Sequence, residues 1–279
     1  GPYYTYKSYG ILVQHMGGVS LMSGNEGEPP ATINTSYSDY HTGAFQPVAI
    51  MGALLRRSLT GQPATMESSI FKSGAVTAGP ALLDYQSNGR MPQRIGNRDH
   101  FSAPHGVYQC QGEDRWCAIA VQTEEQWEAF CRAIGSPGWC GDTEFASLAS
   151  RLANQDRLDQ LVSEWSATQT AEDAMTRLQE AGVPASIVSQ GKDLYESEHL
   201  KARDFYRPTP FYLADRERPA YEWDSKEGIA AANPPKLSES PMEYGPYSNI
   251  GEDNDYIFKE VLGLSQTELD RLTENQSLF

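Results

Sequence analysis

Apolar residues form one long run near the start of the chain, and the residues at its two ends define a helix. The run extends from Ala44 to Leu55, with Asp39 shortly before it and Gly61 shortly after it. Asp favours helix starts and Gly favours helix ends, so the pattern predicts a helix from Asp39 to Gly61. Pro47 lies inside this span and places the beginning of the regular helix near that residue. Three further segments are expected to form a short strand, a second helix and a linker: 63–68, 69–83 and 84–90.

A hairpin followed by capped helices is expected in the middle of the chain. The segments 106–110 and 116–121 flank a glycine-containing turn, which is typical of an antiparallel hairpin. Thr123-Glu124-Glu125-Gln126 matches a capping box and predicts the start of a helix over 127–134. Three more helices and a strand are expected, in this order: 142–149, 152–165, 174–181 and 185–188.

The last third of the chain mixes short elements with proline-rich stretches. Its expected helices are 193–203, 254–262 and 266–275, and its expected strands are 205–212 and 220–223. Changes in residue composition along the chain divide it into the segments 1–88, 89–190 and 191–279. No internal repeat or heptad run joins them.

The charge of the chain narrows its possible partners. The 279 residues carry a net charge of −15, and no stretch of eighteen apolar residues occurs. An acidic chain repels polyanions, so we expect no nucleic-acid partner and no membrane partner. A small anionic ligand remains possible where a few cations converge.

The four cysteines indicate reduced thiols. Cys110, Cys117, Cys131 and Cys140 include no CxxC pair, so we expect no metal site. A disulfide scaffold does not suit so long a chain with so few cysteines. The beginning of the chain resembles neither a signal peptide nor a basic presequence, and it lacks an initiator Met. We therefore expect a cytoplasmic protein, and we expect the chain to be a fragment, a processed product or one piece of a longer polypeptide.

Asp39 is the candidate for chemistry, and its local sequence allows two interpretations. It is either an N-terminal cap that accepts a hydrogen bond from a helix N–H group, or a nucleophile or base supported by helix amides. Phosphate-loop, dinucleotide-loop, zinc-protease and nucleophile-elbow motifs do not occur in the sequence.

An ordered series of short motifs resembles the family III CoA-transferases, the group of formyl-CoA transferase and the carnitine CoA-transferases. The motifs are Gly1-Pro2-Tyr3, Tyr9 to Gln14 with Gly17-Gly18, Pro29-Pro30, Asp39, Gly52 to Arg57 with Thr60-Gly61, Gly96-Asn97-Arg98, Ala103 to Tyr108, Gly112 to Trp116, Gln126-Trp127, Ala181 to Pro184 and Val261 to Ser265. The resemblance covers essentially the whole chain.

The resemblance implies a covalent mechanism at Asp39. In the family, the aspartate attacks the thioester of a CoA donor and forms a mixed anhydride, and CoA then attacks the aspartyl carbonyl to form an enzyme–CoA thioester. An acceptor carboxylate displaces that thioester through a second anhydride. Coenzyme A is thus a substrate, together with an organic carboxylic acid, and no tightly bound cofactor is implied. Covalent catalysis of this kind divides one difficult exchange into easier steps.

Several positions around Asp39 also match the family. Tyr9, thirty residues before Asp39, is implied to orient the site, and Lys7, Tyr9 and Gly10 are implied to contact CoA. Formyl-CoA transferase carries a glutamate at the place of Gly10, which weakens the case for formyl or oxalyl substrates and leaves the aspartate mechanism intact. Related α-methylacyl-CoA racemases place a histidine where Tyr9 stands, and a racemase or epimerase remains the alternative enzyme. Substrate-lining positions are expected at Gly96, Asn97 and Arg98.

The resemblance further implies an α/β fold and an assembly. The large domain is a Rossmann-like open sheet, to which 1–88 contributes the C-terminal part and 191–279 a returning segment, and 89–190 form a smaller α+β domain. Family members are longer and form interlocked dimers, so we expect a homodimer, or a heteromer with a chain that supplies the missing N-terminal half. The fragment is expected to be inactive alone. A catalytically inactive binding or scaffold subunit is the remaining alternative.

Overall fold

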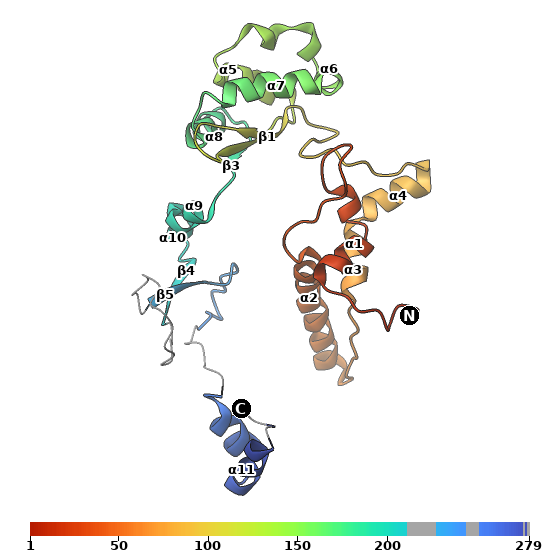
Figure 1. The fold of residues 1–279 in the computed structure, drawn as a ribbon, viewed down its shortest axis with the longest axis vertical. Coiled ribbons are helices and arrows are strands. Elements are labelled where there is room, and N and C mark those ends of the chain that lie inside the picture. Colours follow the sequence, from red (N-terminus) through yellow and green to blue (C-terminus); the bar gives the residue numbers. More distant parts are fainter. Residues whose placement is uncertain (211–226, 244–250, 276, 278–279) are drawn as a thin grey trace. The chain divides into compact units, whose positions relative to one another are not determined.

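The chain divides into two compact units, Gly1–Val188 and Ser189–Phe279. The structure is a computed structural model and describes residues 1–210, 227–243, 251–275 and 277. The first unit contains a helical part followed by a small α+β part, and the second contains short helices and a two-stranded sheet (Figure 1). The expected division into 1–88, 89–190 and 191–279 stays a prediction.

Four helices form the first part of the first unit. They are α1 (Gly10–Met16), α2 (Tyr37–Thr60), α3 (Ile70–Thr77) and α4 (Gly79–Asn88), with a 3-10 turn, η1 (Ser20–Met22), after α1. The end of α2 is confirmed, because Gly61 adopts φ 71° and donates its N–H to the carbonyl of Arg57. A residue with a β-carbon is strained in this left-handed conformation, which explains the glycine.

Three expectations for this part are wrong. Helix α2 begins at Tyr37 rather than near Pro47, because its first turns pack against α1 and α3 and so remain helical on both sides of the proline. Residues 63–68 form no strand. The helix expected over 69–83 is two helices that meet at Ala78, since Pro80 starts a new helix in place of continuing α3. As a result, α4 extends to Asn88 through most of the expected linker.

Small residues allow α1, α2 and α3 to approach closely. A β-carbon added to Gly17, the C-terminal cap of α1, would lie 3.1 Å from backbone atoms of Gly74 on α3. One added to Gly74 would lie 3.1 Å from the Ser38 Oγ atom on α2. These spacings are tighter than ordinary van der Waals contact. The junction of the three helices therefore depends on the absence of side chains at Gly17 and Gly74.

The second part of the first unit is built on a three-stranded antiparallel sheet. Strand β1 (His105–Gln109) pairs with β2 (Trp116–Ala120), which pairs with β3 (Ala185–Ile187). Cys117 faces Tyr108 on one side and Ile187 on the other, which fixes the register. The helices and 3-10 turns between β2 and β3 are α5 (Glu124–Ala133), η2 (Gly138–Gly141), η3 (Thr143–Phe145), α6 (Leu148–Ala153), α7 (Gln155–Ser166) and α8 (Ala171–Glu180). The hairpin and the capping box at Thr123 are confirmed.

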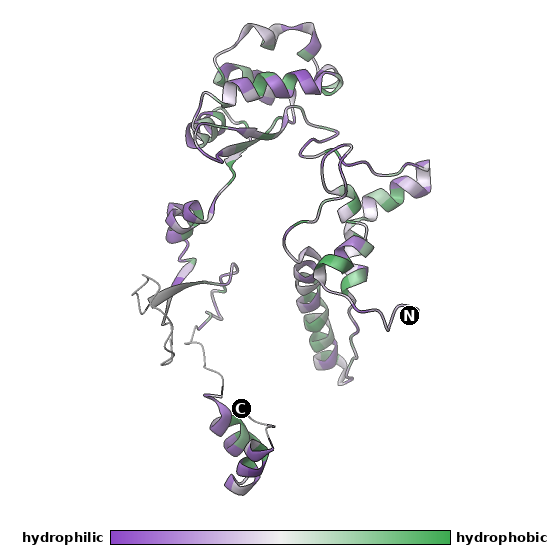
Figure 2. Cartoon of the chain, viewed as in Figure 1, coloured by the Kyte–Doolittle hydropathy of each residue, from purple (hydrophilic) through white to green (hydrophobic). Residues whose placement is uncertain are grey.

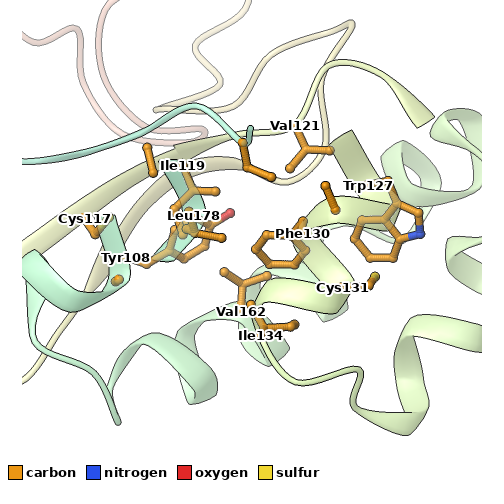
Figure 3. Packing of buried hydrophobic residues seen from close by; sticks show 14 of the residues in the cluster. Tyr108, Cys117, Ile119, Val121, Trp127, Phe130, Cys131, Ile134, Val162 and Leu178 are labelled. Atoms are coloured by element: carbon orange, nitrogen blue, oxygen red, sulfur yellow. The ribbon is translucent and has the colours of Figure 1, made fainter. Parts of the chain in front are cut away.

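Apolar side chains from the sheet and from α5, α7 and α8 meet in a single core. Figure 3 shows Val121, Phe130, Val162 and Leu178 in this cluster, all of them fully buried. Arg151 is also fully buried, beside this core. Its guanidinium donates to the carbonyls of Ala103 and Phe145 and to the Glu124 carboxylate, and it lies 4.8 Å from the Trp127 ring.

The second unit begins with α9 (Gly191–Glu196) and α10 (Glu198–Ala202), which replace the single helix expected over 193–203. Strands β4 (Tyr206–Pro210) and β5 (Glu227–Ala231) are antiparallel. A π-helical turn, η4 (Tyr256–Val261), and α11 (Gln266–Glu274) follow, and the capping box at Ser265 is confirmed. The strand expected over 220–223 and the end of the one expected over 205–212 lie outside the described residues.

The fold is a mixture of helices and antiparallel strands. Mixed α/β architecture is confirmed, whereas residues 1–88 contribute helices and no strand, so the open sheet expected for the large domain is not found in the described part of the chain. Figure 2 shows an apolar stripe along α2. Its members Val48, Met51, Leu55 and Leu59 are 61–76% exposed. Among the described residues, no helix has both the length and the apolarity needed to cross a membrane.

Candidate active site

Asp39 lies in the first turn of α2 and is not the helix cap. Ser36 occupies the cap position, and the Asp39 N–H group donates to the Ser36 carbonyl at 2.9 Å. The cap interpretation of Asp39 is therefore wrong. A carboxylate in the first turn nevertheless lies at the positive end of the helix dipole.

One oxygen of the Asp39 carboxylate is buried and has no partner. The Oδ2 atom accepts no hydrogen bond from any described residue, although the residue as a whole is only half-buried. The other oxygen, Oδ1, is not among the buried and unpartnered side-chain atoms, so only Oδ2 is enclosed in this way. The arrangement thus favours nucleophilic chemistry over a purely structural role, because a structural carboxylate in this position would be expected to have donors.

Gly10 provides the space in which this oxygen lies. A β-carbon built on Gly10 would stand 2.0 Å from the Asp39 Oδ2 atom and 2.8 Å from the Ser36 Oγ atom. The backbone of Gly10 does not have a positive φ, so space rather than conformation requires the glycine. The structure therefore brings together two of the predicted site residues, Asp39 and Gly10, and gives a reason why this chain carries no side chain at position 10.

Tyr9 and Lys7 precede α1. The Tyr9 carbonyl accepts the N–H of Val13, which makes Tyr9 the N-terminal cap residue of α1, and its side chain is 81% exposed. Lys7 is exposed, and its ammonium forms no ion pair with a described residue. Both side chains are available to a ligand, and their contacts with CoA stay predictions.

Two buried polar residues, one on α1 and one on α2, were not identified from the sequence as site residues. Gln14 on α1 and Ser38 on α2 are completely buried, and the Gln14 amide atoms and the Ser38 Oγ atom have no hydrogen-bond partner among the described residues. Gln14 interrupts the apolar sequence Ile11-Leu12-Val13 of a helix, and this was the available signal.

His41 was also overlooked, and it has a structural role. Its ring stacks on Tyr37 and meets the edge of Phe45. The Nδ1 atom lies 3.2 Å from the Ser73 carbonyl and 3.2 Å from the Thr77 hydroxyl, so the ring joins α2 to α3. A histidine held in this way is not free to act as a mobile base.

The predicted lining residues Gly96, Asn97 and Arg98 belong to a concavity of about 560 Å³ whose lining does not include Asp39. Arg98 donates to Asp159 at 3.0 Å and to Asp156 at 2.6 Å, and the Asn97 carbonyl contacts the His105 ring at 2.6 Å. These contacts occupy the guanidinium of Arg98, so it offers little charge to an anionic substrate.

The thiols do not form a metal centre. All four cysteines are free, and no group of three or more His, Cys, Asp or Glu residues in the described part of the chain is arranged to hold a metal ion. A hydrogen bond from Cys131 lowers the pKa of Cys140, whereas burial raises the pKa of Cys117 to about 11. The two thiols therefore differ in reactivity.

Comparison with known proteins adds a family and a fold. Residues 1–240 match the profile of CoA-transferase family III. The chain is 26% identical over its whole length to a probable CoA-transferase, Rv1866, of Mycobacterium tuberculosis, and it covers 35% of that protein. It is 26% identical to succinyl-CoA–D-citramalate CoA-transferase of Chloroflexus aurantiacus, with 98% of this chain and 65% of the relative aligned.

A solved structure shares the fold. The crystal structure of a CAIB/BAIF family protein from Brucella suis superposes with a TM-score of 0.78 at 22% identity, over 94% of this chain and 65% of the other. The chain thus spans about two thirds or less of the length of these proteins.

Proposed function

This chain belongs to CoA-transferase family III, and from that membership we propose that it takes part in moving CoA from an acyl-CoA donor to an organic carboxylate, with Asp39 as the nucleophile. The observation that supports this role most directly is the unpartnered Oδ2 atom of Asp39 in the space left by Gly10. An acceptor-only group that is buried without donors is unfavourable for stability, and such groups concentrate at functional sites.

The proposed reaction has four steps at Asp39. The carboxylate attacks the thioester carbonyl of the donor, the C–S bond breaks, and CoA leaves as a thiolate with a mixed anhydride remaining. The thiolate attacks the Asp39 carbonyl and releases the donor acid as a carboxylate. The acceptor carboxylate then attacks the aspartyl–CoA thioester, the C–S bond breaks, and CoA leaves as a thiolate with a second anhydride remaining. CoA thiolate finally attacks the acceptor acyl carbonyl, which yields the new acyl-CoA and restores Asp39.

Each step exchanges one anionic leaving group for another and needs no net proton transfer. The positive end of α2 supports the charge that returns to the Asp39 carboxyl group. We assign to Tyr9 the orientation of the reacting acyl group and to Lys7 an ion pair with a phosphate of CoA, because both side chains are accessible at the beginning of α1.

We also propose that the active assembly contains a second chain. The exposed stripe Val48, Met51, Leu55 and Leu59 on α2 is a continuous apolar face of the kind that folded proteins normally cover. Its occupant is either a second copy of this chain or a polypeptide that contributes the remaining part of the family's large domain.

The experiment follows CoA exchange between an unlabelled acyl-CoA and the isotopically labelled form of its own free acid. This exchange requires every step of the mechanism and no knowledge of the physiological acceptor. The wild-type chain, assayed in its assembly with the second chain, is expected to incorporate label into the acyl-CoA, and Asp39→Asn in the same assembly is expected to incorporate none. Full exchange by the Asn variant would exclude Asp39 as the nucleophile, and exchange of the α-proton in place of the acid would indicate a racemase.

A further inference from the structure

The face of α1 that contacts α2 and α3 contains Gly10, Gln14 and Gly17. Residues separated by four and by seven positions share one side of a helix. Gly10 faces the Asp39 carboxylate on α2, and Gly17 faces Gly74 on α3. Gln14 therefore projects between these two contacts, into the junction next to the first turn of α2.

The buried Gln14 amide makes no hydrogen bond with a described residue. Its relative exposure is 0%, and neither its Oε1 atom nor its Nε2 atom has a partner among the described residues. The Asp39 Oδ2 atom lacks a donor on the same side of the junction, against the same face of α1. An unused donor and an unused acceptor thus lie on facing elements, and both are costly to bury in that state.

We propose that Gln14 is a positioning residue for Asp39, whose amide N–H donates to the Asp39 carboxyl oxygen during the acylated stages of the reaction. This inference rests on the proposed function. In the resting state the Oδ2 atom has no donor among the described residues. We assign the attack on the donor thioester to the other oxygen, Oδ1, so that Oδ2 remains the carbonyl oxygen of the anhydride and of the thioester.

The need for a donor arises when CoA thiolate attacks the Asp39 carbonyl of the mixed anhydride. The new C–S bond forms, the carbonyl oxygen becomes an oxyanion, and the bond to the donor acyl oxygen then breaks as the donor acid leaves. A preorganised N–H group stabilises that oxyanion in a site from which water is excluded, and no proton moves. The same donor serves the later attack on the aspartyl–CoA thioester.

Two substitutions at Gln14 test the contribution of its amide N–H group, in the protein as its native host produces it and together with its partner chain. Gln14→Met keeps the length and helix propensity of the side chain and removes both polar atoms. Gln14→Glu keeps the length of the side chain and its oxygen acceptors, and it removes the donor when the carboxyl group is ionised. The readout is the single-turnover rate at which the Asp39–CoA thioester forms from an acyl-CoA, measured beside the melting temperature.

We expect both variants to form the thioester about 100-fold more slowly, the scale of losing one oxyanion donor. Gln14→Met is also expected to melt about 2–4 °C higher, because an unpaired buried amide has been removed. Activity and stability thus move in opposite directions, which a purely structural role does not produce. Should Gln14→Met fail to fold, Gln14→Leu carries the same test.

Ser20→Ala is the matched control. Ser20 is 2% exposed and its Oγ atom is also unpartnered, but it lies in η1 and outside the face that contacts Asp39. We expect a small gain in melting temperature and an unchanged rate. The inference is overturned if Gln14→Met retains the wild-type rate, or if its rate falls together with its melting temperature. Failure of the wild-type protein to form any Asp39 thioester would instead reject the proposed function.

Discussion

The contact between Gly10 and Asp39 leads to a sharp prediction for Gly10→Ala. Real β-carbons essentially never approach another heavy atom more closely than 3.0 Å, whereas the added β-carbon would stand 2.0 Å from the Asp39 Oδ2 atom. The carboxylate must therefore move by at least 3.0 − 2.0 = 1.0 Å. Because this oxygen is the end of a rotatable side chain, the shift is inexpensive for folding. A misplacement of about 1 Å at a reacting atom lowers the rate by about 100-fold, or about 2.7 kcal/mol of activation free energy.

Stability is expected to respond differently from activity in this variant. Ala is the better helix former, so Gly10→Ala should leave the free energy of unfolding unchanged or slightly higher. The assay compares kcat/KM for acyl-CoA-dependent CoA transfer with the denaturant midpoint of unfolding. The reasoning is refuted if Gly10→Ala retains wild-type kcat/KM, or if the loss of activity follows a loss of stability.

Gly43→Ala provides the matched control for this prediction. Gly43 lies in α2, the helix that carries Asp39, away from the face of Val48, Met51, Leu55 and Leu59, and nothing stands within 4 Å of an added β-carbon. The substitution should stabilise the helix by about 1 kcal/mol and leave kcat/KM unchanged. A loss of activity in Gly43→Ala would show that helix propensity in α2, rather than the contact at Gly10, affects the site.

Three further predictions concern the α+β part. Arg151→Met should destabilise this part by about 2–4 kcal/mol in denaturant unfolding, because it leaves the buried carbonyls of Ala103 and Phe145 without their donor. The ion pair with the half-exposed Glu124 adds little to this loss, and an unchanged midpoint would contradict the prediction. The hydrogen bond from Arg151 lowers the pKa of Glu124 in the folded state. The stability that this pair adds should therefore be present above the unfolded pKa of about 4.3 and be lost as the pH falls further. Glu124→Gln should reduce this loss of stability at acid pH, as measured by denaturant unfolding at a series of pH values. Cys140 should react with iodoacetamide near pH 8 while Cys117, with its pKa raised to about 11, stays unmodified, as peptide mass spectrometry would show; equal labelling would contradict it.

Local signals in the sequence were sufficient for part of the fold. Helix ends were predicted correctly where their hydrogen bonds are made by residues only a few positions away. The capping boxes at Thr123 and Ser265 and the C-terminal cap at Gly61 are of this kind. Pro47 and Pro80 carry the same local meaning but behave differently. Packing against α1 and α3 keeps α2 helical ahead of Pro47, and such tertiary contacts cannot be read from a short window.

The candidate site also contains residues that the sequence identified and residues whose role became visible only in the folded structure. Asp39 was found from its place before an apolar helix together with the family resemblance, and the reason for Gly10 became visible only when the two helices were brought together. Gln14 entered the sequence analysis only as part of a family motif, because a polar residue beside His15 at the end of a short helix is common, and only its complete burial without partners sets it apart. Arg98 illustrates the converse, since its long-range ion pairs with Asp156 and Asp159 occupy a cation that the sequence presents as free.

The central claim is that Asp39 carries CoA as a thioester during turnover. The most direct measurement incubates the protein with an acyl-CoA, traps the thioester with hydroxylamine and locates the resulting hydroxamate by peptide mass spectrometry. The account predicts a hydroxamate on Asp39 in the wild-type protein and none in Asp39→Asn. A wild-type protein that transfers CoA while the Asp39 peptide keeps its unmodified mass would contradict it.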